Sequence, residues 1–320
     1  MEDFPQTLSE FEDRFGTEEA CLAYLSALRW PNGFVCPHCE GSAAWLINRG
    51  LWHCRDCGKQ TSVKSGTIFH RSRKPIKLWF RAMWYITNQK YGANALGLQR
   101  VLALGSYHTA WEWLHRLRRA MVRPGRERLS GCVQVDETYI GGAKPGKRGR
   151  GAQGKALVAI AVEERSPKGI GRIRLGVIPD ASAESLTDFV MRNVVEGSII
   201  KTDDWRGYTG LFGAGYQRQI LPSEQMKLPH LVASLLKRWL LGTYQGAVRP
   251  THLEYYLDEY TFRFNRRTSR SRGKLFYRLV QQSILIDPIS GSELKAPTAC
   301  QENENFDNLG APEPQDIGGA

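Results

Sequence analysis

The most specific chemical signal in the sequence is a set of four cysteines in two CxxC pairs. The 14 residues between the pairs are a spacing typical of a structural zinc site. Four thiolates fill a tetrahedral shell, so no coordination position remains for a reactive water. Two nearby histidines, His38 and His53, are therefore weaker ligand candidates. The expected zinc ligands are Cys36, Cys39, Cys54 and Cys57.

Two aspartates on expected strands form a second candidate site. Asp136 lies in the run 133–140, and Asp203 follows the run 198–202. Side chains on a strand alternate between faces, so Asp136 and Glu137 cannot share one site. If the two strands are neighbours, Asp136 and Asp203 meet at one end of a sheet, where their oxygens suit Mg²⁺ or Mn²⁺. The pattern alone equally allows a turn-capping Asp136 and a solvated Asp203.

A helix expected over 229–241 adds a histidine and a lysine. His230 follows Pro229, a residue favoured in the first turn of a helix. Lys237 lies seven residues further on, about two turns, so both side chains project from nearly the same face. His230 is a candidate metal ligand and Lys237 a candidate phosphate contact. The alternative for His230 is a capping or surface residue.

The charge of the chain points to a polyanionic partner. The net charge is +12 over 320 residues, although residues 288–320 carry six acids against Lys295. A chain this basic is typical of a nucleic-acid-binding protein. Two basic stretches, a loop over 141–154 and the run that begins at Arg263 near the end of an expected helix over 252–264, are candidate phosphate contacts, with a solvated face as the alternative. These candidates are Lys144, Lys147, Arg148, Arg150, Arg263, Arg266, Arg267 and Arg270.

The cellular compartment follows from the cysteine count and the first residues. Seven cysteines are an odd number, and the acidic start of the chain has no apolar core. A disulfide framework and a signal peptide are therefore not expected. No run of 18 apolar residues is present, so we expect no membrane span. Together these features predict a cytoplasmic protein.

The elements that must position these residues change in type along the chain. Helical spacing of apolar residues predicts helices within 6–30 and 76–121. Within the second range, two helices around Gly105 and Ser106 form a helix-turn-helix pattern, with a helical linker as the alternative. From Gly131 onward the order is three strands, a helix, two strands and further helices. This order is typical of a layered α/β fold.

Four motifs in order carry a resemblance to a known family. They are VDETYIGG over 135–142, TDDWRGY over 202–208, HLVASLLKRWL over 230–240 and YTFRFNRR over 260–267. With the two CxxC pairs, they resemble the bacterial insertion-sequence transposases that have an ISXO2-like domain. The resemblance covers residues 5 to 286. It implies a DDE-type catalytic core of RNase H-like α/β fold, with a mixed five-stranded sheet behind a zinc ribbon.

The resemblance also implies an activity and a set of catalytic residues. The activity is metal-dependent cleavage of DNA at terminal inverted repeats, followed by strand transfer into target DNA by a homo-oligomer that joins two ends. Asp136 and Asp203 would be the first two catalytic acids, and His230 would take the third position with Lys237 after it. Glu224 is the nearest competing acid. An imidazole is a softer ligand than Mg²⁺ usually prefers.

The chain is thus expected to contain five segments and to act as a Mg²⁺- or Mn²⁺-dependent DNA transposase with structural zinc. One alternative is a regulator that uses only its DNA-binding parts, and another is a transposase derivative that binds ends without cutting. The expected segments are an N-terminal helical segment over 1–30, a zinc ribbon over 31–70, a helix-turn-helix-like DNA-binding region over 71–125, a catalytic domain over 130–286 and a disordered acidic tail over 287–320.

Overall fold

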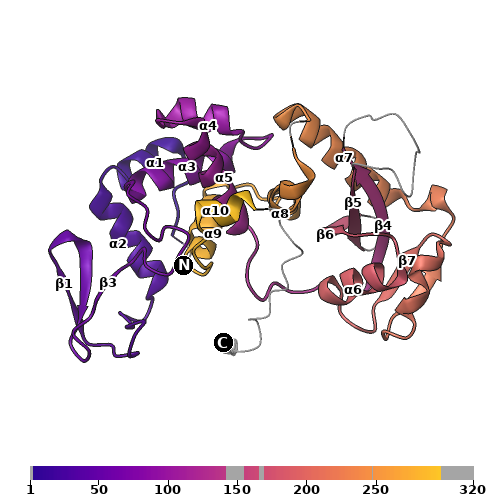
Figure 1. The fold of residues 1–320 in the computed structure, drawn as a ribbon, viewed down its shortest axis with the longest axis horizontal. Helices are drawn as coiled ribbons and strands as arrows, with labels where there is room; N and C mark the ends of the chain where they lie inside the picture. The colour runs from indigo at the N-terminus through magenta and orange to yellow at the C-terminus, as the bar shows by residue number, and fades with distance from the viewer. Residues whose placement is uncertain (1–2, 142–154, 166–168, 247, 297–320) are drawn as a thin grey trace, which may run out of the picture.

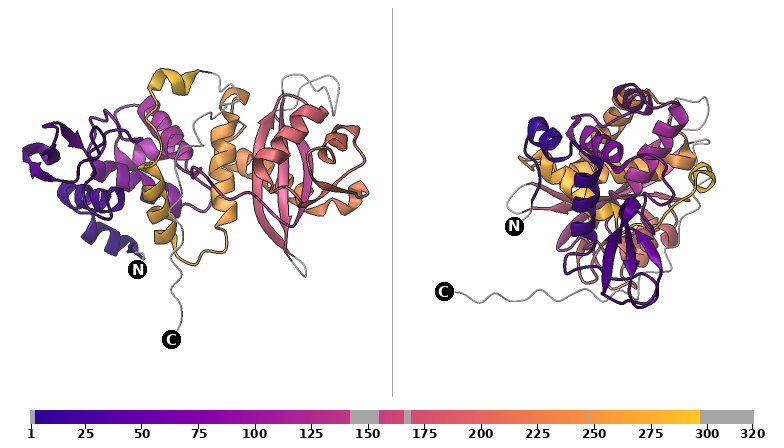
Figure 2. Two further views of the ribbon diagram at one scale, coloured as in Figure 1. Left: turned by 90° about the horizontal axis from the view of Figure 1, so that it is seen from below. Right: turned by 90° about the vertical axis from the view of Figure 1, so that its left-hand side faces the viewer.

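The chain folds into three parts that follow one another along its longest axis (Figure 1). The computed structural model describes residues 3–141, 155–165, 169–246 and 248–296. A small ribbon lies at one end, a helical body lies in the middle, and a five-stranded sheet with its own helices lies at the other end (Figure 2). Within the described residues, no helix has both the length and the apolar character needed to cross a bilayer.

The ribbon is a three-stranded antiparallel sheet. Its strands are β1 (Ala44–Ile47), β2 (Leu51–Cys54) and β3 (Gln60–Ser62), in the order β1-β2-β3. A short 3₁₀ helix, η1 (Asn48–Gly50), joins the first two strands. Strands β1 and β2 lie on either side of residues 48–50, and β3 adds a third strand to the ribbon.

The helical body is held together by one aromatic-rich core. Trp79 of α3 stacks on Trp113 of α5, with ring centroids 3.9 Å apart. The side chains of Thr17 and Ser106 accept hydrogen bonds from the first turns of α2 and α5, so both residues are N-caps. The helices of the body are α1 (Leu8–Arg14), α2 (Glu18–Arg29), α3 (Ile76–Asn88), α4 (Ala95–Leu102), α5 (Tyr107–Arg119) and α9 (Arg272–Ser283).

The position of α9 corrects the expected end of the catalytic domain at residue 286. The Phe276 ring packs against the rings of Phe80 and Trp84 of α3, with centroids 5.5 and 5.7 Å apart. Leu275 and Leu279 are buried in the same core. The apolar face of α9 is thus covered by the helical body and not by the sheet. The segment that follows the sheet domain in the sequence thus packs against the N-terminal helices.

The expected disordered tail over 287–320 also needs correction in its first part. Residues Gly291–Lys295 form a short helix, α10, which begins with a capping box between Ser290 and Glu293. Ile289 and Leu294 are buried beside Tyr255. Burial of these two apolar side chains explains why the segment is ordered despite its polar composition. Residues 297–320 lie outside the described part of the chain.

The sheet domain has the mixed five-stranded sheet predicted for an RNase H-like core. The strand order is β6-β5-β4-β7-β8, where β4, β5 and β6 pair antiparallel and β7 and β8 run parallel to β4. The strands are β4 (Cys132–Ile140), β5 (Ala156–Glu164), β6 (Ile170–Ile178), β7 (Ile199–Thr202) and β8 (Gln217–Ile220). The predicted α/β fold is confirmed.

Helices cover both faces of this sheet. Helix α6 (Ala183–Asn193) and the 3₁₀ helix η2 (Arg206–Leu211) pack on one face, and α7 (Lys227–Tyr244) and α8 (Leu253–Asn265) pack on the other. The near-continuous apolar run of β5 follows from this double cover, since both of its faces are buried. Two further 3₁₀ helices, η3 (Ser223–Gln225) and η4 (Pro250–His252), precede α7 and α8.

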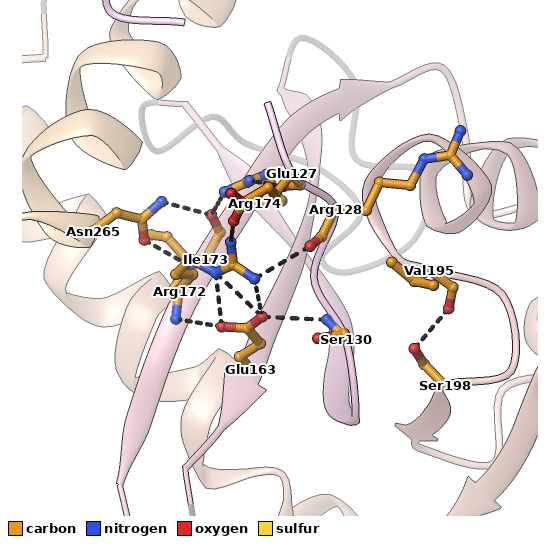
Figure 3. A network of polar contacts seen from close by, with 10 residues as sticks. All are labelled: Glu127, Arg128, Ser130, Glu163, Arg172, Ile173, Arg174, Val195, Ser198 and Asn265. Carbon is orange, nitrogen blue, oxygen red and sulfur yellow. Dashed lines mark hydrogen bonds and ion pairs between the residues drawn. The ribbon is translucent and has the colours of Figure 1, made fainter. Parts of the chain in front are cut away.

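A polar network fixes the chain where it enters β4 (Figure 3). The Arg172 guanidinium pairs with Glu163 at 2.7 Å and with Glu127 at 2.9 Å. The backbone N–H of Ser130 donates to the same Glu163 carboxylate at 3.2 Å. These contacts tie the segment before β4 to the edges of β5 and β6. They hold the start of the strand on which Asp136 lies.

Candidate active site and zinc ribbon

Adjacent parallel strands bring the two candidate aspartates together. In the β4–β7 pair, Gln134 lies opposite Lys201. The same register two residues further on places Asp136 opposite Asp203, which directly follows β7. Directly opposite residues of a parallel pair share one face of the sheet. The condition set for this site, that the two strands are neighbours, is therefore met.

The Asp136 carboxylate is held in a mostly buried and negatively charged position. Its side chain is 18% exposed, and its Oδ1 accepts a hydrogen bond from the Glu137 N–H at 2.8 Å. Burial raises the pKa of Asp136, and the nearby Glu137 and Asp203 carboxylates raise it further. The cost of holding these charges together would fall if a cation lay between Asp136 and Asp203.

Two side chains of helix α7 contact residues on one face of β4. His230 Nε2 lies 3.1 Å from Asp136 Oδ2, and Lys237 Nζ donates to Thr138 Oγ1 at 2.8 Å. Asp136 and Thr138 are two residues apart, so they share one face of the strand. The predicted common face of His230 and Lys237 is confirmed. Burial and the neighbouring Lys155 charge lower the pKa of Lys237.

Glu137 points to the opposite face of the sheet. Tyr208 of η2 donates its hydroxyl to Glu137 Oε2 at 2.7 Å. Burial raises the pKa of Tyr208 well above its usual range, so the hydroxyl stays protonated and serves as the donor. This contact confirms that Asp136 and Glu137 do not share a site. Tyr208 is the last residue of the motif over 202–208, but nothing in that motif indicates that its side chain is buried against Glu137.

The geometry of the four cysteines fits a zinc ion. Cys36 Sγ lies 3.7 Å from Cys57 Sγ, and Cys39 Sγ lies 3.6 Å from Cys54 Sγ. A tetrahedron with Zn–S bonds of about 2.3 Å has edges of about 3.8 Å. All four sulfurs lie within 4.8 Å of one another. The predicted ligand set is therefore assembled without either histidine. His53 instead packs beside the Trp45 ring, with centroids 4.5 Å apart.

The potential ligand atoms of the aspartate site lie further apart than those of the zinc site. In the described part of the chain, the four cysteines are the one group of three or more potential ligands with all atoms within 4.8 Å. Asp136, Asp203 and His230 do not form such a group. Their donor types nevertheless fit a divalent ion, because two carboxylates supply hard oxygen ligands. Glu224 lies exposed in η3, before the helix that carries His230.

The structure argues against Arg263 as a DNA contact. Its guanidinium pairs with the buried Glu259 at 2.9 Å and donates to the carbonyl oxygen of Gln89 at 2.9 Å. The Arg263 N–H groups that would bind a phosphate therefore already have partners within the protein. The four candidates in the basic loop lie outside the described residues, and they are Lys144, Lys147, Arg148 and Arg150.

The other arginines after α8 differ in how far they are exposed. The half-buried Arg266 packs over the Phe262 ring, with its guanidinium carbon 4.0 Å from the centroid. Arg267 is exposed, although its guanidinium also donates to a carbonyl oxygen of α8 at 2.9 Å and to one of β6 at 3.2 Å. Arg270 is exposed as well. Arg267 and Arg270 therefore present positive charge to solvent near the end of α8.

Comparison with known families connects both sites to one class of protein. Residues 128–265 match the ISXO2-like transposase domain, and residues 16–60 match the transposase zinc-ribbon domain. The chain carries an ISXO2-like transposase domain behind a transposase zinc ribbon. The transposase domain includes Asp136, Asp203 and His230, and it ends before α9. All four cysteines lie within the zinc-ribbon match.

Individual relatives are more distant. A protein of the transposable element ISH50 of Halobacterium salinarum, itself uncharacterized, is 26% identical over 216 residues, which are 62% of this chain and 71% of the relative. The catalytic core domain of BIV integrase is 20% identical, with a TM-score of 0.30 over 44% of this chain and 86% of that chain. The Mos1 strand transfer complex is 13% identical, with a TM-score of 0.22 over 59% and 75% of the two chains.

Proposed function

We propose that this protein is a DNA transposase that cuts the terminal inverted repeats of its element and joins the freed 3′ ends to target DNA. The observation that supports this proposal is the pairing of β4 with β7, whose register continued by two residues brings Asp136 opposite Asp203, together with the 3.1 Å contact between His230 and Asp136. Two carboxylates on adjacent strands supply the ligands that a Mg²⁺ or Mn²⁺ ion requires. The membership of this region in a transposase domain supports the same activity.

Each residue of the site has a distinct task in this proposal. Asp136 and Asp203 hold the divalent ion, which when bound supplies activation of water and stabilisation of the leaving 3′ oxygen. His230 orients the Asp136 carboxylate through their 3.1 Å contact and is placed to act as a third ligand. Lys237, held beside Thr138, provides a positive charge for a phosphate of the bound strand.

DNA contacts outside the site come from basic surfaces along the chain. The helical body and the zinc ribbon bind the element ends, and the exposed Arg267 and Arg270 contact phosphates near the sheet, with Arg266 beside them. Two ends must be joined in one reaction, so the active species is a homo-oligomer. The reaction takes place on DNA in the bacterial cytoplasm.

A cleavage assay with matched variants tests this function. The substrate is a duplex with the inverted repeats that flank the reading frame, incubated with Mg²⁺ or Mn²⁺. We expect Asp136→Asn and Asp203→Asn each to reduce cleavage by about a thousandfold or more, because metal binding contributes several kcal/mol to the transition state. Binding of the duplex should persist.

The control is Asp204→Asn, which removes a charge from the exposed neighbour of Asp203. We expect this variant to cut at the wild-type rate. Wild-type cleavage by Asp136→Asn would show that Asp136 does not hold the catalytic metal.

A further inference from the structure

The Asp203 carboxylate belongs to a segment that lies just beyond the end of a strand. Strand β7 ends at Thr202, and its pairing with β8 ends where Thr202 lies opposite Ile220. Strand pairing fixes the backbone of a residue through ladder hydrogen bonds, and Asp203 lies outside that pairing. The position of its carboxylate relative to Asp136 must therefore be set by other contacts.

Arg218 of β8 supplies three of these contacts through its guanidinium group. Its Nε donates to Thr202 Oγ1 at 3.0 Å, and one terminal nitrogen donates to the carbonyl oxygens of Asp203 at 2.9 Å and Trp205 at 3.1 Å. The Thr202 hydroxyl donates to the same Asp203 oxygen at 2.8 Å. The N–H donors of a guanidinium form a rigid planar fork, so these oxygens are held in a fixed arrangement.

The backbone of Trp205 in turn orients the Asp203 carboxylate. The Trp205 N–H donates to Asp203 Oδ1 at 3.1 Å, a contact typical of an Asx turn. The Trp205 indole is itself anchored, since its Nε1 donates to the Ala181 carbonyl oxygen at 2.8 Å. Arg218 thus acts on the Asp203 carboxylate in two ways, through the carbonyl group of Asp203 itself and through Trp205.

Arg218 lies behind the candidate active site and not within it. In the parallel β7–β8 pair, Arg218 lies opposite Ile200, whose side chain is buried in the core beneath α6 and η2. Its guanidinium carbon lies 5.9 Å from the centroid of the Tyr208 ring, and Tyr208 bonds to Glu137 on this same face. Asp136 lies on the other face. The sheet therefore separates Arg218 from a metal ion beside Asp136.

We propose that Arg218 is a positioning residue for the metal site, which fixes the Asp203 carboxylate at the distance from Asp136 that a divalent ion requires. The proposal rests on the proposed transposase function and adds to it a residue on the opposite face of the sheet. Residues that orient a metal ligand change metal affinity or activity by about 10–100-fold when they are replaced. A lysine in place of Arg218 keeps the positive charge but not the fork, so that variant separates geometry from charge.

Hydrogen exchange in the full-length protein without DNA or divalent ions tests the contacts themselves. We expect Arg218→Lys to speed amide exchange of residues 203–208 by about tenfold, because a segment opens more readily when its hydrogen bonds are lost. The matched control is Arg206→Lys, since Arg206 is exposed and its guanidinium lies over the Trp205 ring, 5.7 Å from the centroid. This control should exchange as the wild type does. Unchanged exchange of residues 203–208 in Arg218→Lys, or equal acceleration throughout β4 and β5, would overturn the proposal.

Binding of Mn²⁺ to the zinc-loaded protein, followed by the EPR signal of the free ion, tests the consequence for the site. We expect Arg218→Lys to weaken this binding by about tenfold or more, and Arg206→Lys to bind as the wild type does. Wild-type affinity in Arg218→Lys, together with weakened binding in Asp203→Asn, would overturn the role of Arg218 alone. Wild-type affinity in Asp203→Asn would instead contradict the proposed function.

A second pair of variants tests the same role if Arg218→Lys does not fold. Thr202→Val removes the hydroxyl that contacts both Arg218 and the Asp203 carbonyl oxygen, while Thr202→Ser keeps it. We expect Thr202→Val to speed exchange of residues 203–208 and to weaken Mn²⁺ binding, and Thr202→Ser to resemble the wild type. Identical behaviour of these two variants would overturn the proposal.

Discussion

The Asp136 carboxylate lies close to two other acidic side chains, those of Glu137 and Asp203. The repulsion between these charges needs a physical explanation. Glu137 has its own partner, Tyr208, on the opposite face of the sheet. Asp203 remains on the same face, and its charge disfavours ionisation of Asp136. Two neighbouring carboxylates destabilise the folded protein unless a cation neutralises their charge. For this reason we regard Asp136 and Asp203 as a metal site.

The contact between His230 and Asp136 leads to a prediction at the scale of one residue. We expect His230→Ala to lower the cleavage rate by about 10–100-fold, because a side chain that orients a metal-binding carboxylate has an effect of this size. His230→Glu should retain more activity, since an oxygen ligand suits Mg²⁺. Single-turnover cleavage in Mg²⁺ and in Mn²⁺ measures both effects. An Ala variant as fast as the wild type would remove His230 from the site.

Some residues of the site were predictable from the sequence and others were not. The period-two pattern of β4 separates Asp136 from Glu137, and the same pattern places Thr138 on the face of Asp136. The charge of Arg263 was misinterpreted because a run of cations does not reveal which of them is buried. Its partner Glu259 lies one helical turn earlier, and that spacing was an available signal.

At the scale of elements, a buried ion pair joins the helical body to the sheet domain. Arg118 of α5 pairs with Glu259 of α8 at 2.9 Å, and both side chains are almost fully buried, at 1% and 0% exposed. Tyr244 of α7 also contacts both groups. Arg263 contacts the second oxygen of Glu259. The Glu259 carboxylate therefore links three helices, α5, α7 and α8.

Removal of that carboxylate charge is expected to weaken the whole fold. Glu259→Gln leaves Arg118 buried without a counter-ion, which costs about 3–5 kcal/mol of unfolding free energy. Glu127→Gln is the matched control, because Glu127 pairs with Arg172 at the same 2.9 Å but is 75% exposed, and its loss should cost less than about 1 kcal/mol. Urea unfolding midpoints measure both changes. A Glu259→Gln variant as stable as the control would contradict this role.

The order of the strands and helices along the chain could be predicted from the sequence. Which strands pair and which helices pack together was harder to predict. Local periodicity indicated all five strands of the sheet. The pairing of β4 with β7 depends on contacts between residues 67 positions apart, and a pattern within each strand does not specify them. Helix α9 shows the same limit, since its own periodicity does not specify that it packs on α1, α2 and α3.

At the scale of the whole molecule, the zinc ribbon and the five-stranded sheet lie at opposite ends, with the helical body between them (Figure 2). A bound DNA end must extend along this length if both parts contact it. The ribbon has a core of only a few side chains, including two of the cysteines. Its fold therefore depends on the metal.

This separation predicts that loss of zinc affects end binding without loss of the sheet domain. We expect Cys54→Ser to reduce the zinc content from about one ion per chain to none, and to weaken binding of the terminal repeat by about tenfold or more. Cys132→Ser, at the start of β4, should keep its zinc. Metal analysis and a binding titration provide the measurements. Unchanged zinc in Cys54→Ser would contradict the ribbon site.

The most direct test of the account is the location of a bound metal. Crystals of the full-length protein soaked in Mn²⁺ would be measured for anomalous scattering, which identifies the ion independently of any activity. We expect a peak between the carboxylates of Asp136 and Asp203 that disappears in Asp203→Asn. Mn²⁺ sites elsewhere, with no peak at these two aspartates, would contradict the central claim.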